Sequence, residues 1–191
     1  MGRPAVFLDR DGTIVREVDY LRSAHSLRLL PGAAEAIRRL NRAGYAVVIA
    51  TNQSGIARGL LTEDDLKGIH GTLIQRLAKR GARIDAIYYC PHHPQAAVER
   101  YRRRCRCRKP QSGMLARAAR DLQLDLARSV AVGDSARDIE AGQRAGCRTV
   151  LVRTGYGAEA EADLRQRPPD HIASNLSEAA SWILRRAKRT E

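Results

Sequence analysis

Short apolar runs alternate along the chain with stretches in which apolar residues recur every three or four positions. The first pattern is typical of buried strands and the second of helices. Together they predict strands at 5–9, 46–51, 85–90, 129–134, 148–153 and 170–173, and helices at 31–45, 62–81, 112–124, 136–146 and 176–188. Strands about thirty residues apart with helices between them predict an α/β fold, a Rossmann-like doubly wound parallel sheet of five or six strands.

Three of the predicted strands end in polar clusters. Strand 5–9 continues into DRDGT, strand 46–51 into TNQSG, and strand 129–134 into GDSARD. Ligands of open α/β sheets bind at the carboxyl ends of strands, so we expect the three clusters to meet in one crevice. Asp and Gly are also common in ordinary turns, but turns alone would not place such clusters after three strands. The crevice is the predicted functional site.

Composition narrows the possible partners. The 191 residues fit a single domain, 1–191, with a mostly aliphatic core because only 4% of the residues are aromatic. Thirty-four Lys and Arg against 21 Asp and Glu give a formal charge of +13. This charge favours phosphate esters or nucleic acid as partners, unless it merely reflects an arginine-rich proteome. No apolar stretch has the length of a signal-peptide core or a membrane span, so we expect a cytoplasmic protein with no membrane partner.

The carboxylates of Asp9 and Asp11 predict phosphoryl-transfer chemistry. They lie two residues apart at a strand end, roughly 6.6 Å apart if the chain stays extended, so one can attack an electrophile while the other manages a proton. Asp134 follows a parallel strand and completes an oxygen cage for Mg²⁺, which takes one or two carboxylates together with phosphate and water. Asp138, one helical turn later, either supports this metal site or caps the following helix.

Four side chains in the loop 90–110 predict a structural zinc site. Cys90 and His92 follow a predicted strand, and Cys105 and Cys107 precede a Lys-Pro pair. Three thiolates and one imidazole form a closed tetrahedral set suited to zinc, and a long loop in a compact domain usually needs a function or a staple. The alternative is a group of reduced surface thiols that happen to be close.

The polar motifs resemble those of the haloacid-dehalogenase-like (HAD) phosphatase superfamily, and all four can be matched in order. FLDRDGT resembles the first motif, which implies Asp9 as a nucleophile that forms an aspartyl-phosphate and Asp11 as general acid and base. Thr51 matches the second motif, where a hydroxyl and neighbouring amides hold phosphoryl oxygens. Lys109 matches the third, a cation that neutralises the transferring group, and Asp134 the fourth. The resemblance implies Mg²⁺ on Asp9, Asp11 and Asp134.

The zinc loop resembles that of one HAD subfamily, which includes the D-glycero-D-manno-heptose 1,7-bisphosphate 7-phosphatases and the histidinol-phosphate phosphatases. The twelve residues between His92 and Cys105 resemble the longer loop of the heptose enzymes, and EVDYL, TNQSGIARG and CPHHP match further. The resemblance implies a monomer. It also implies substrate contacts from Asp19, Tyr20, Leu21, Arg22, Asn52, Gln53, Ser54 and Arg108.

The spacing of the motifs predicts a nearly capless enzyme. The segment between Thr13 and Pro31 is too short for a folded cap domain, and the helix, strand and zinc loop use up the chain between the second motif and Lys109. One position departs from the family pattern. Ser135 follows the metal-binding aspartate where many relatives carry Lys, and Arg137 is a candidate to replace that cation.

The resemblance implies a Mg²⁺-dependent sugar bisphosphate phosphatase that removes the 7-phosphate of a heptose 1,7-bisphosphate, a step towards nucleotide-activated heptose for lipopolysaccharide. Histidinol-phosphate phosphatase is the nearest alternative because it shares the motifs and the zinc. A polynucleotide 3'-phosphatase would benefit from the charge of +13, but the chain has few aromatics for base stacking. A nucleic-acid-binding zinc module is the alternative outside enzymes, although a binder would not need the nucleophile.

Overall fold

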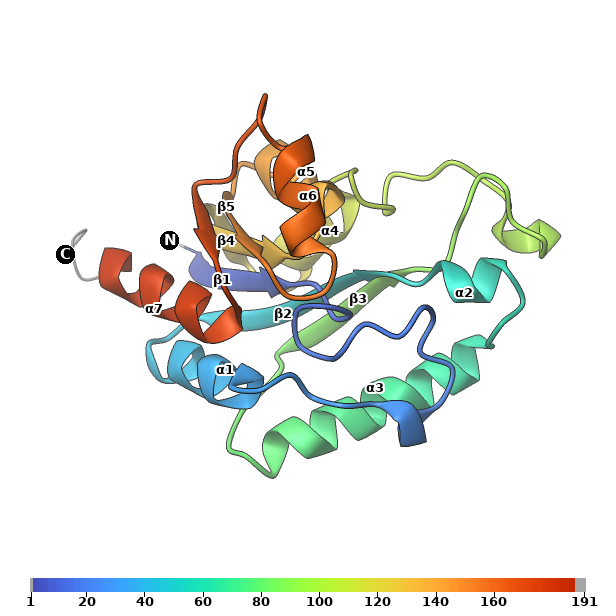
Figure 1. Ribbon diagram of the computed structural model, residues 1–191, viewed down its shortest axis with the longest axis horizontal. Helices are drawn as coiled ribbons and strands as arrows, with labels where there is room; N and C mark the ends of the chain where they lie inside the picture. Colours follow the sequence, from blue (N-terminus) through green and yellow to red (C-terminus); the bar gives the residue numbers. More distant parts are fainter. Residues whose placement is uncertain (1, 188–191) are drawn as a thin grey trace.

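The computed structural model describes residues 2–187, and its six strands form one parallel sheet in the order β3–β2–β1–β4–β5–β6 (Figure 1). The strands are β1 (Arg3–Leu8), β2 (Ala46–Asn52), β3 (Ala86–Cys90), β4 (Leu124–Gly133), β5 (Arg148–Val152) and β6 (His171–Ala173). The predicted doubly wound sheet is confirmed. The winding reverses between β1 and β4, which is the point where such sheets bind ligands.

Helices cover both faces of this sheet (Figure 1). They are α1 (Ala33–Arg42), α2 (Ser54–Ala57), α3 (Glu63–Ala78), α4 (Gly113–Asp121), α5 (Ala136–Arg144), α6 (Gly157–Asp163) and α7 (Leu176–Ala187), with 3-10 turns at Ala24–Ser26 and Glu99–Tyr101. Side chains of α1, α3 and α7 share one hydrophobic cluster, and those of α4 belong to another. The two clusters lie on opposite faces of the sheet.

Side chains of strand β2 pack on both faces of the sheet. Val47 and Ile49 belong to the cluster with α1, α3 and α7, whereas Val48 and Ala50 belong to the cluster with α4. Side chains alternate along a strand, so a strand covered on both faces must be apolar at every position. This is why AVVIAT has no polar residue until its carboxyl end, where the functional cluster begins.

The predicted elements lie within three residues of their expected bounds, except at the start of β4. The helix predicted at 112–124 ends at Asp121, and Gln123 with a φ of 53° turns the chain. Strand β4 consequently begins at Leu124, five residues before the predicted start. The short helices α2 and α6 were not predicted because a single turn shows no period. Residue 188, where the last predicted helix ends, lies outside the described residues.

The first two connections at the carboxyl edge of the sheet contain little regular structure. Between β1 and α1 the chain forms one 3-10 turn, and between β2 and α3 it forms only the four-residue helix α2. Neither connection folds as a cap domain, which agrees with the expected capless arrangement. None of the helices within residues 2–187 has the length and apolar character needed to cross a membrane.

Candidate active site

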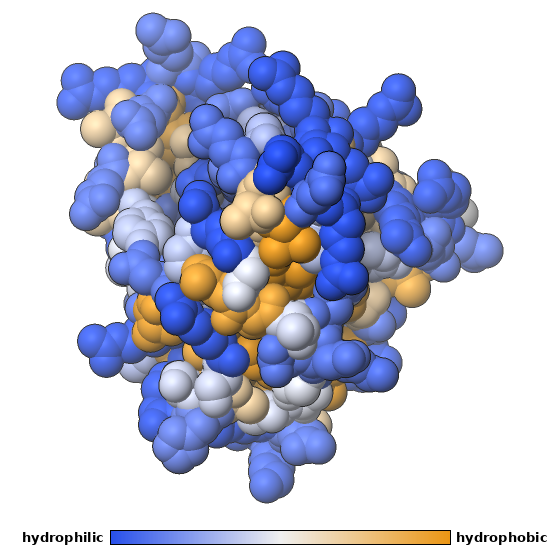
Figure 2. Space-filling model, turned by 90° about the vertical axis from the view of Figure 1, so that its right-hand side faces the viewer, coloured by the Kyte–Doolittle hydropathy of each residue, from blue (hydrophilic) through white to orange (hydrophobic). Residues whose placement is uncertain are grey.

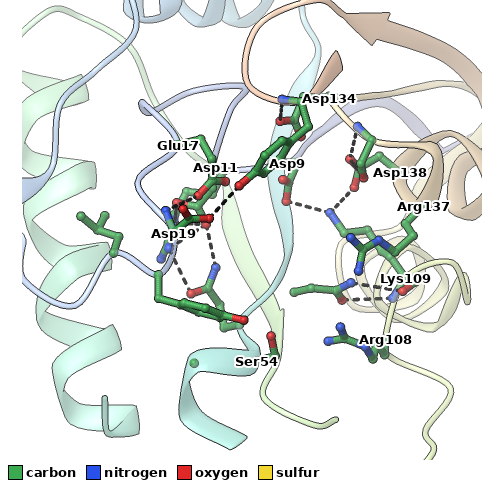
Figure 3. Close-up of a pocket in the computed structure, with 18 of the residues that line it drawn as sticks. Asp9, Asp11, Glu17, Asp19, Ser54, Arg108, Lys109, Asp134, Arg137 and Asp138 are labelled. Atoms are coloured by element: carbon green, nitrogen blue, oxygen red, sulfur yellow. Dashed lines mark hydrogen bonds and ion pairs between the residues drawn. The ribbon is translucent and has the colours of Figure 1, made fainter. Parts of the chain in front are cut away.

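An open cleft of about 480 Å³ lies at the carboxyl edge of the sheet. Residues from all three predicted polar clusters line it, so the clusters meet in one place as expected. Figure 2 shows the side of the molecule to which the carboxyl ends of β1 and β2 point, with apolar side chains gathered near its centre and hydrophilic ones around them. Figure 3 shows the polar side chains of the cleft.

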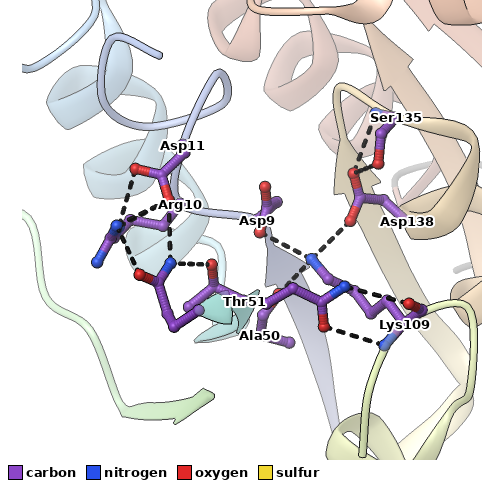
Figure 4. A network of polar contacts seen from close by, with 10 residues as sticks. Asp9, Arg10, Asp11, Ala50, Thr51, Lys109, Ser135 and Asp138 are labelled. Carbon is purple, nitrogen blue, oxygen red and sulfur yellow. Dashed lines mark hydrogen bonds and ion pairs between the residues drawn. The ribbon is translucent and has the colours of Figure 1, made fainter. Parts of the chain in front are cut away.

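Lys109 is a buried cation whose three donors are all used. Its ammonium nitrogen lies 2.7 Å from Asp9 Oδ1, 2.5 Å from Asp138 Oδ1 and 2.6 Å from the carbonyl oxygen of Ala50 (Figure 4). An ammonium group has three donors and no acceptor, so these contacts satisfy it completely. Burial would lower the pKa of Lys109, but the charges of Asp138 and Asp9 raise it above its usual value. The side chain therefore stays charged.

Three carboxylates surround a space suited to a divalent cation. One oxygen from each of Asp9, Asp134 and Asp138 lies within 4.8 Å of the others. Burial raises the pKa of Asp9 to about 6, and burial together with the charges of Asp9 and Asp138 raises the pKa of Asp134 to about 8. Three ionised carboxylates and the Lys109 ammonium leave a net charge of −2, which one divalent cation balances. The residues present therefore fit Mg²⁺.

Two glycines allow the chain to pack directly against Asp134. A Cβ atom on Gly12 or Gly155 would lie 1.9 or 2.0 Å from Asp134 Oδ2. Both residues have positive φ, 72° and 58°, a conformation that glycine adopts at little cost. Asp134 Oδ2 also accepts a hydrogen bond from the backbone N–H of Tyr156 at 2.9 Å. One carboxylate oxygen is thereby fixed by the fold.

Asp138 caps the following helix, one of the two roles considered from the sequence, and also pairs with Lys109. Its Oδ2 accepts hydrogen bonds from the backbone N–H and the hydroxyl of Ser135, at 3.0 and 2.6 Å, which caps the start of α5. Its Oδ1 contacts the Lys109 ammonium. The helix cap therefore orients a carboxylate that also supports the charged centre.

Asp11 lies in a separate cluster, turned away from Asp9 and Asp138 (Figure 4). The guanidinium of Arg10, only 1% exposed, donates to both its oxygens, at 3.1 and 2.8 Å. Gln53 accepts from Arg10 at 3.0 Å and donates to Asp11 and Thr51, each at 3.0 Å. Burial and the charge of Arg10 lower the pKa of His70 to about 4, so its neutral ring can accept from Arg10 at 3.3 Å. The cluster holds the Asp11 carboxylate in one orientation.

The four predicted zinc ligands lie together. The sulfur atoms of Cys90, Cys105 and Cys107 are 3.2 to 3.5 Å apart, and Nδ1 of His92 lies 3.6 and 3.4 Å from those of Cys90 and Cys107. These sulfurs are too far apart for disulfides. The edges of a zinc tetrahedron with bonds near 2.3 Å measure about 3.8 Å, so the cluster has almost the size of a zinc site.

The zinc cluster connects to the mouth of the cleft. Arg108 donates to the carbonyl oxygen of His92 at 3.2 Å and, together with Arg58 and Arg137, lines the cleft. These three guanidinium groups form no ion pair with any carboxylate of residues 2–187. Burial and the charges of Arg58 and Arg137 lower the pKa of Arg108. Burial and the charges of all three arginines lower the pKa of His93, which also lines the cleft. This side of the cleft therefore carries three guanidinium charges that repel one another.

Comparison with known proteins agrees with this geometry. Residues 106–179 match the HAD-hydrolase-like family model. The D-glycero-D-manno-heptose-1,7-bisphosphate 7-phosphatase of Thermosynechococcus vestitus is 46% identical over 189 residues, which cover 96% of each chain. The chain belongs to the heptose-1,7-bisphosphate 7-phosphatase family.

Further relatives in this family cover the chain equally well. The D-glycero-beta-D-manno-heptose-1,7-bisphosphate 7-phosphatase of Escherichia coli strain K12 is 41% identical over 186 residues, 97% of this chain and 96% of that one. The crystal structure of the D,D-heptose 1,7-bisphosphate phosphatase from B. bronchiseptica, complexed with magnesium and phosphate, superposes with a TM-score of 0.86 at 39% identity. It covers 96% of this chain and 99% of that chain.

Most of the predicted site residues of this heptose-phosphatase family member face the cleft, with informative exceptions. The Asp11 carboxylate does not join the metal-sized cluster, in which Asp138 stands in its place, because Arg10 and Gln53 engage it. Thr51 is buried and does not line the cleft. Arg22 is exposed outside the cleft, because the neighbouring buried Leu21 anchors the loop.

Two predicted substrate contacts are engaged with the protein itself. Asn52 exchanges two hydrogen bonds of 3.1 Å with the backbone of Lys109, and Gln53 holds Asp11. Sequence reasoning missed Arg10, His70 and Tyr156. The strand-end position of Arg10 beside the two aspartates was an available signal, but His70 and Tyr156 have no motif around them.

We expect Cys105→Ser to lose the zinc and to lower the Tm strongly, because structural zinc sites contribute on the order of 10 kcal/mol in peptides. Metal content by mass spectrometry and Tm by calorimetry measure both effects. Cys147→Ser is the matched control, because Cys147 is a buried cysteine that does not belong to the group of four candidate ligands. Stoichiometric zinc and an unchanged Tm in the Cys105 variant would contradict the zinc site.

We expect Mg²⁺ to raise the Tm more at pH 8 than at pH 6. The pKa values of about 6 for Asp9 and about 8 for Asp134 exceed the usual value near 4, so the metal-free fold loses stability as the pH rises from about 4 to about 8. Mg²⁺ offsets this loss only where the carboxylates are ionised. At about a hundred times its Kd it should add about 2.7 kcal/mol.

The measurement is the Tm of zinc-loaded protein with and without Mg²⁺ at each pH. Asp134→Asn should lose most of the difference between the two pH values, whereas Asp64→Asn, on the exposed side of α3, should keep it. An equal gain at pH 6 and pH 8 would show that these carboxylates do not bind the cation.

Proposed function

We propose that the protein is a Mg²⁺-dependent phosphatase that releases the 7-phosphate of D-glycero-D-manno-heptose 1,7-bisphosphate. The observation that supports this most is the Asp9 carboxylate, held by the buried Lys109 beside two further carboxylates and below a mouth of unpaired arginines. This arrangement suits a nucleophile that must approach a phosphate dianion. The names of the two relatives and the phosphate and magnesium in the bacterial neighbour support the same substrate and cation.

In the proposed reaction, Asp9 attacks phosphorus with the carboxylate oxygen that Lys109 does not hold. The new Asp9 O–P bond forms as the bond from phosphorus to the sugar oxygen breaks, and Asp11 gives the departing oxygen its proton. A water then attacks phosphorus, Asp11 takes the proton of that water, and inorganic phosphate and free Asp9 result. A carboxylate needs no base to activate it at neutral pH, so the protein only has to offset charge and move the proton.

Two kinds of cation offset the negative charge of the phosphoryl group and the carboxylates, a lysine and a divalent metal ion. Lys109 stabilises negative charge on the transferring phosphoryl group and on Asp9. Bound Mg²⁺, held by Asp9, Asp134 and Asp138, would supply the remaining positive charge. Asp11 has to rotate out of its contacts with Arg10 and Gln53 to reach the leaving oxygen, and those contacts orient it when no substrate is bound.

The arginine mouth supports a substrate with a second anionic group. Arg58, Arg108 and Arg137 line the cleft without carboxylate partners, and guanidinium groups bind phosphate through paired, charge-assisted hydrogen bonds. Arg137 also supplies a cation near the position where Ser135 replaces the lysine of many relatives. In this proposal the 7-phosphate lies at Asp9 and the 1-phosphate lies among the arginines.

We expect Asp9→Asn to lower kcat about a thousandfold or more, because the nucleophile is lost. The fold should remain intact, since burial already disfavours the charged form of Asp9. Phosphate release measures the first effect and Tm the second, with Asp64→Asn as the surface control. Activity within tenfold of the parent protein would exclude the covalent mechanism.

The substrate is tested by phosphate release, with Mg²⁺, from both anomers of heptose 1,7-bisphosphate, heptose 7-phosphate, histidinol phosphate, fructose 1,6-bisphosphate and a 3'-phosphorylated oligonucleotide. We expect kcat/KM for one heptose bisphosphate anomer to exceed the others by about a hundredfold, a ratio that several polar contacts supply. A preference for histidinol phosphate or the oligonucleotide would reject the proposed substrate while keeping the mechanism.

A further inference from the structure

Tyr156 bridges the two sides of the cleft. It follows β5 in the turn that contains Gly155, and its backbone N–H donates to Asp134 Oδ2 at 2.9 Å. Its hydroxyl donates to Asp19 Oδ1 at 2.7 Å, on the loop after β1. A single residue thus contacts the proposed metal site through its backbone and the opposite wall of the cleft through its side chain.

The loop that Tyr156 contacts has an unusual backbone. Asp19 and Tyr20 have φ angles of 41° and 72°, in the left-handed region that residues other than glycine rarely adopt. Such a conformation persists only where the surroundings hold it. Glu17 Oε1 accepts hydrogen bonds of 2.9 Å from the backbone N–H groups of Val18 and Asp19. Glu17 therefore holds the loop from within, and Tyr156 holds it from across the cleft.

The side chain of Tyr156 has no evident role in the core. It is 45% exposed and belongs to none of the three hydrophobic clusters of residues 2–187. Its hydrogen bond to Asp19, together with burial, raises the pKa of Tyr156 to about 12, so the hydroxyl remains a donor near neutral pH. An exposed aromatic ring that lines a cleft and donates to a carboxylate is better suited to a ligand than to packing.

Asp19 is consequently a fixed acceptor. Tyr156 occupies its Oδ1, which leaves Oδ2 for a further hydrogen bond, and a carboxylate accepts several. Hydroxyl groups are the donors that a sugar offers to such an acceptor. Because the carboxylate is already held in place, binding a sugar hydroxyl costs less conformational entropy than it would with a freely rotating side chain.

We propose that Tyr156 is a positioning residue that holds Asp19 against the sugar. It thereby sets the preference of the cleft for a polyhydroxylated phosphate ester over one without sugar hydroxyl groups. The proposal rests on the proposed function in taking heptose 1,7-bisphosphate as the sugar. Tyr156 contributes to the binding of the sugar, whereas the phosphoryl group itself is bound at Asp9 and Lys109.

The test compares kcat/KM for heptose 1,7-bisphosphate with kcat/KM for p-nitrophenyl phosphate, which offers no sugar hydroxyls. We expect Tyr156→Phe to lower this ratio about tenfold, mainly through KM for the sugar, as for the loss of one hydrogen bond to a charged group. In an Asp19→Ala background, Tyr156→Phe should have little further effect, because its partner is already missing.

Tyr88→Phe is the matched control. The Tyr88 hydroxyl also donates to an aspartate, Asp121 at 3.0 Å, but Tyr88 does not line the cleft. The ratio of the two kcat/KM values in Tyr88→Phe should therefore equal that of the parent protein. The Tm of Tyr156→Phe establishes that this variant is folded. An unchanged ratio in Tyr156→Phe, or an equal fall in the presence and absence of Asp19, would overturn the proposal.

The two proposals fail separately. If the parent protein prefers another sugar phosphate, the proposed substrate is rejected, and the ratio is then measured with the preferred sugar against p-nitrophenyl phosphate. An unchanged ratio in Tyr156→Phe, or an equal fall in the presence and absence of Asp19, would overturn the role of Tyr156 in that case as well.

Discussion

The architecture of the site depends on the buried ammonium group of Lys109. A charge removed from water is costly unless its partners replace the lost hydration, and here two carboxylates and one carbonyl oxygen satisfy all three donors. These acceptors come from the end of β1, the first turn of α5 and strand β2. One cation therefore fixes the relative positions of three elements that the sheet alone would hold less tightly.

Lys109 lies on a loop, so further contacts are needed to fix its position. Asn52 binds the lysine backbone from the end of β2, and the four-residue cluster that includes Cys107 ties the same loop to β3. None of the four cluster residues lines the cleft, yet the neighbouring Arg108 and Lys109 do, so the cluster helps to fix where these two cations lie. This explains why a phosphatase of this kind carries cysteines in a segment of arginines: the grouped thiols hold the loop in place, and two of its cations line the cleft.

The sheet and the convergence of polar clusters could be predicted because both follow from local patterns, namely apolar runs and the residues that end them. The grouping of the four candidate zinc ligands could be predicted because thiols and an imidazole at close spacing have few other uses. The orientation of Asp11 could not, since it depends on Arg10 being buried, and Arg10 is buried because His70 on α3 accepts from it across sixty residues of sequence. The outward position of Arg22 depends on a loop with two left-handed residues, whose side chains do not alternate as in a strand.

The layout of charge suggests how the cleft selects a bisphosphate. With all three carboxylates ionised, the floor has a net charge of −2 that a divalent cation balances. The mouth has three arginines that repel one another and form no ion pair with a carboxylate of residues 2–187. A substrate with one phosphate binds at the floor, beside Lys109 and the divalent cation, and leaves the repulsion among the arginines unchanged. A substrate with a second phosphate at the right distance also relieves the repulsion at the mouth, so binding gains both a new attraction and the removal of an existing strain. Selectivity then depends on the separation of the two phosphates, which the rigid frame around Lys109 and the zinc cluster keeps constant.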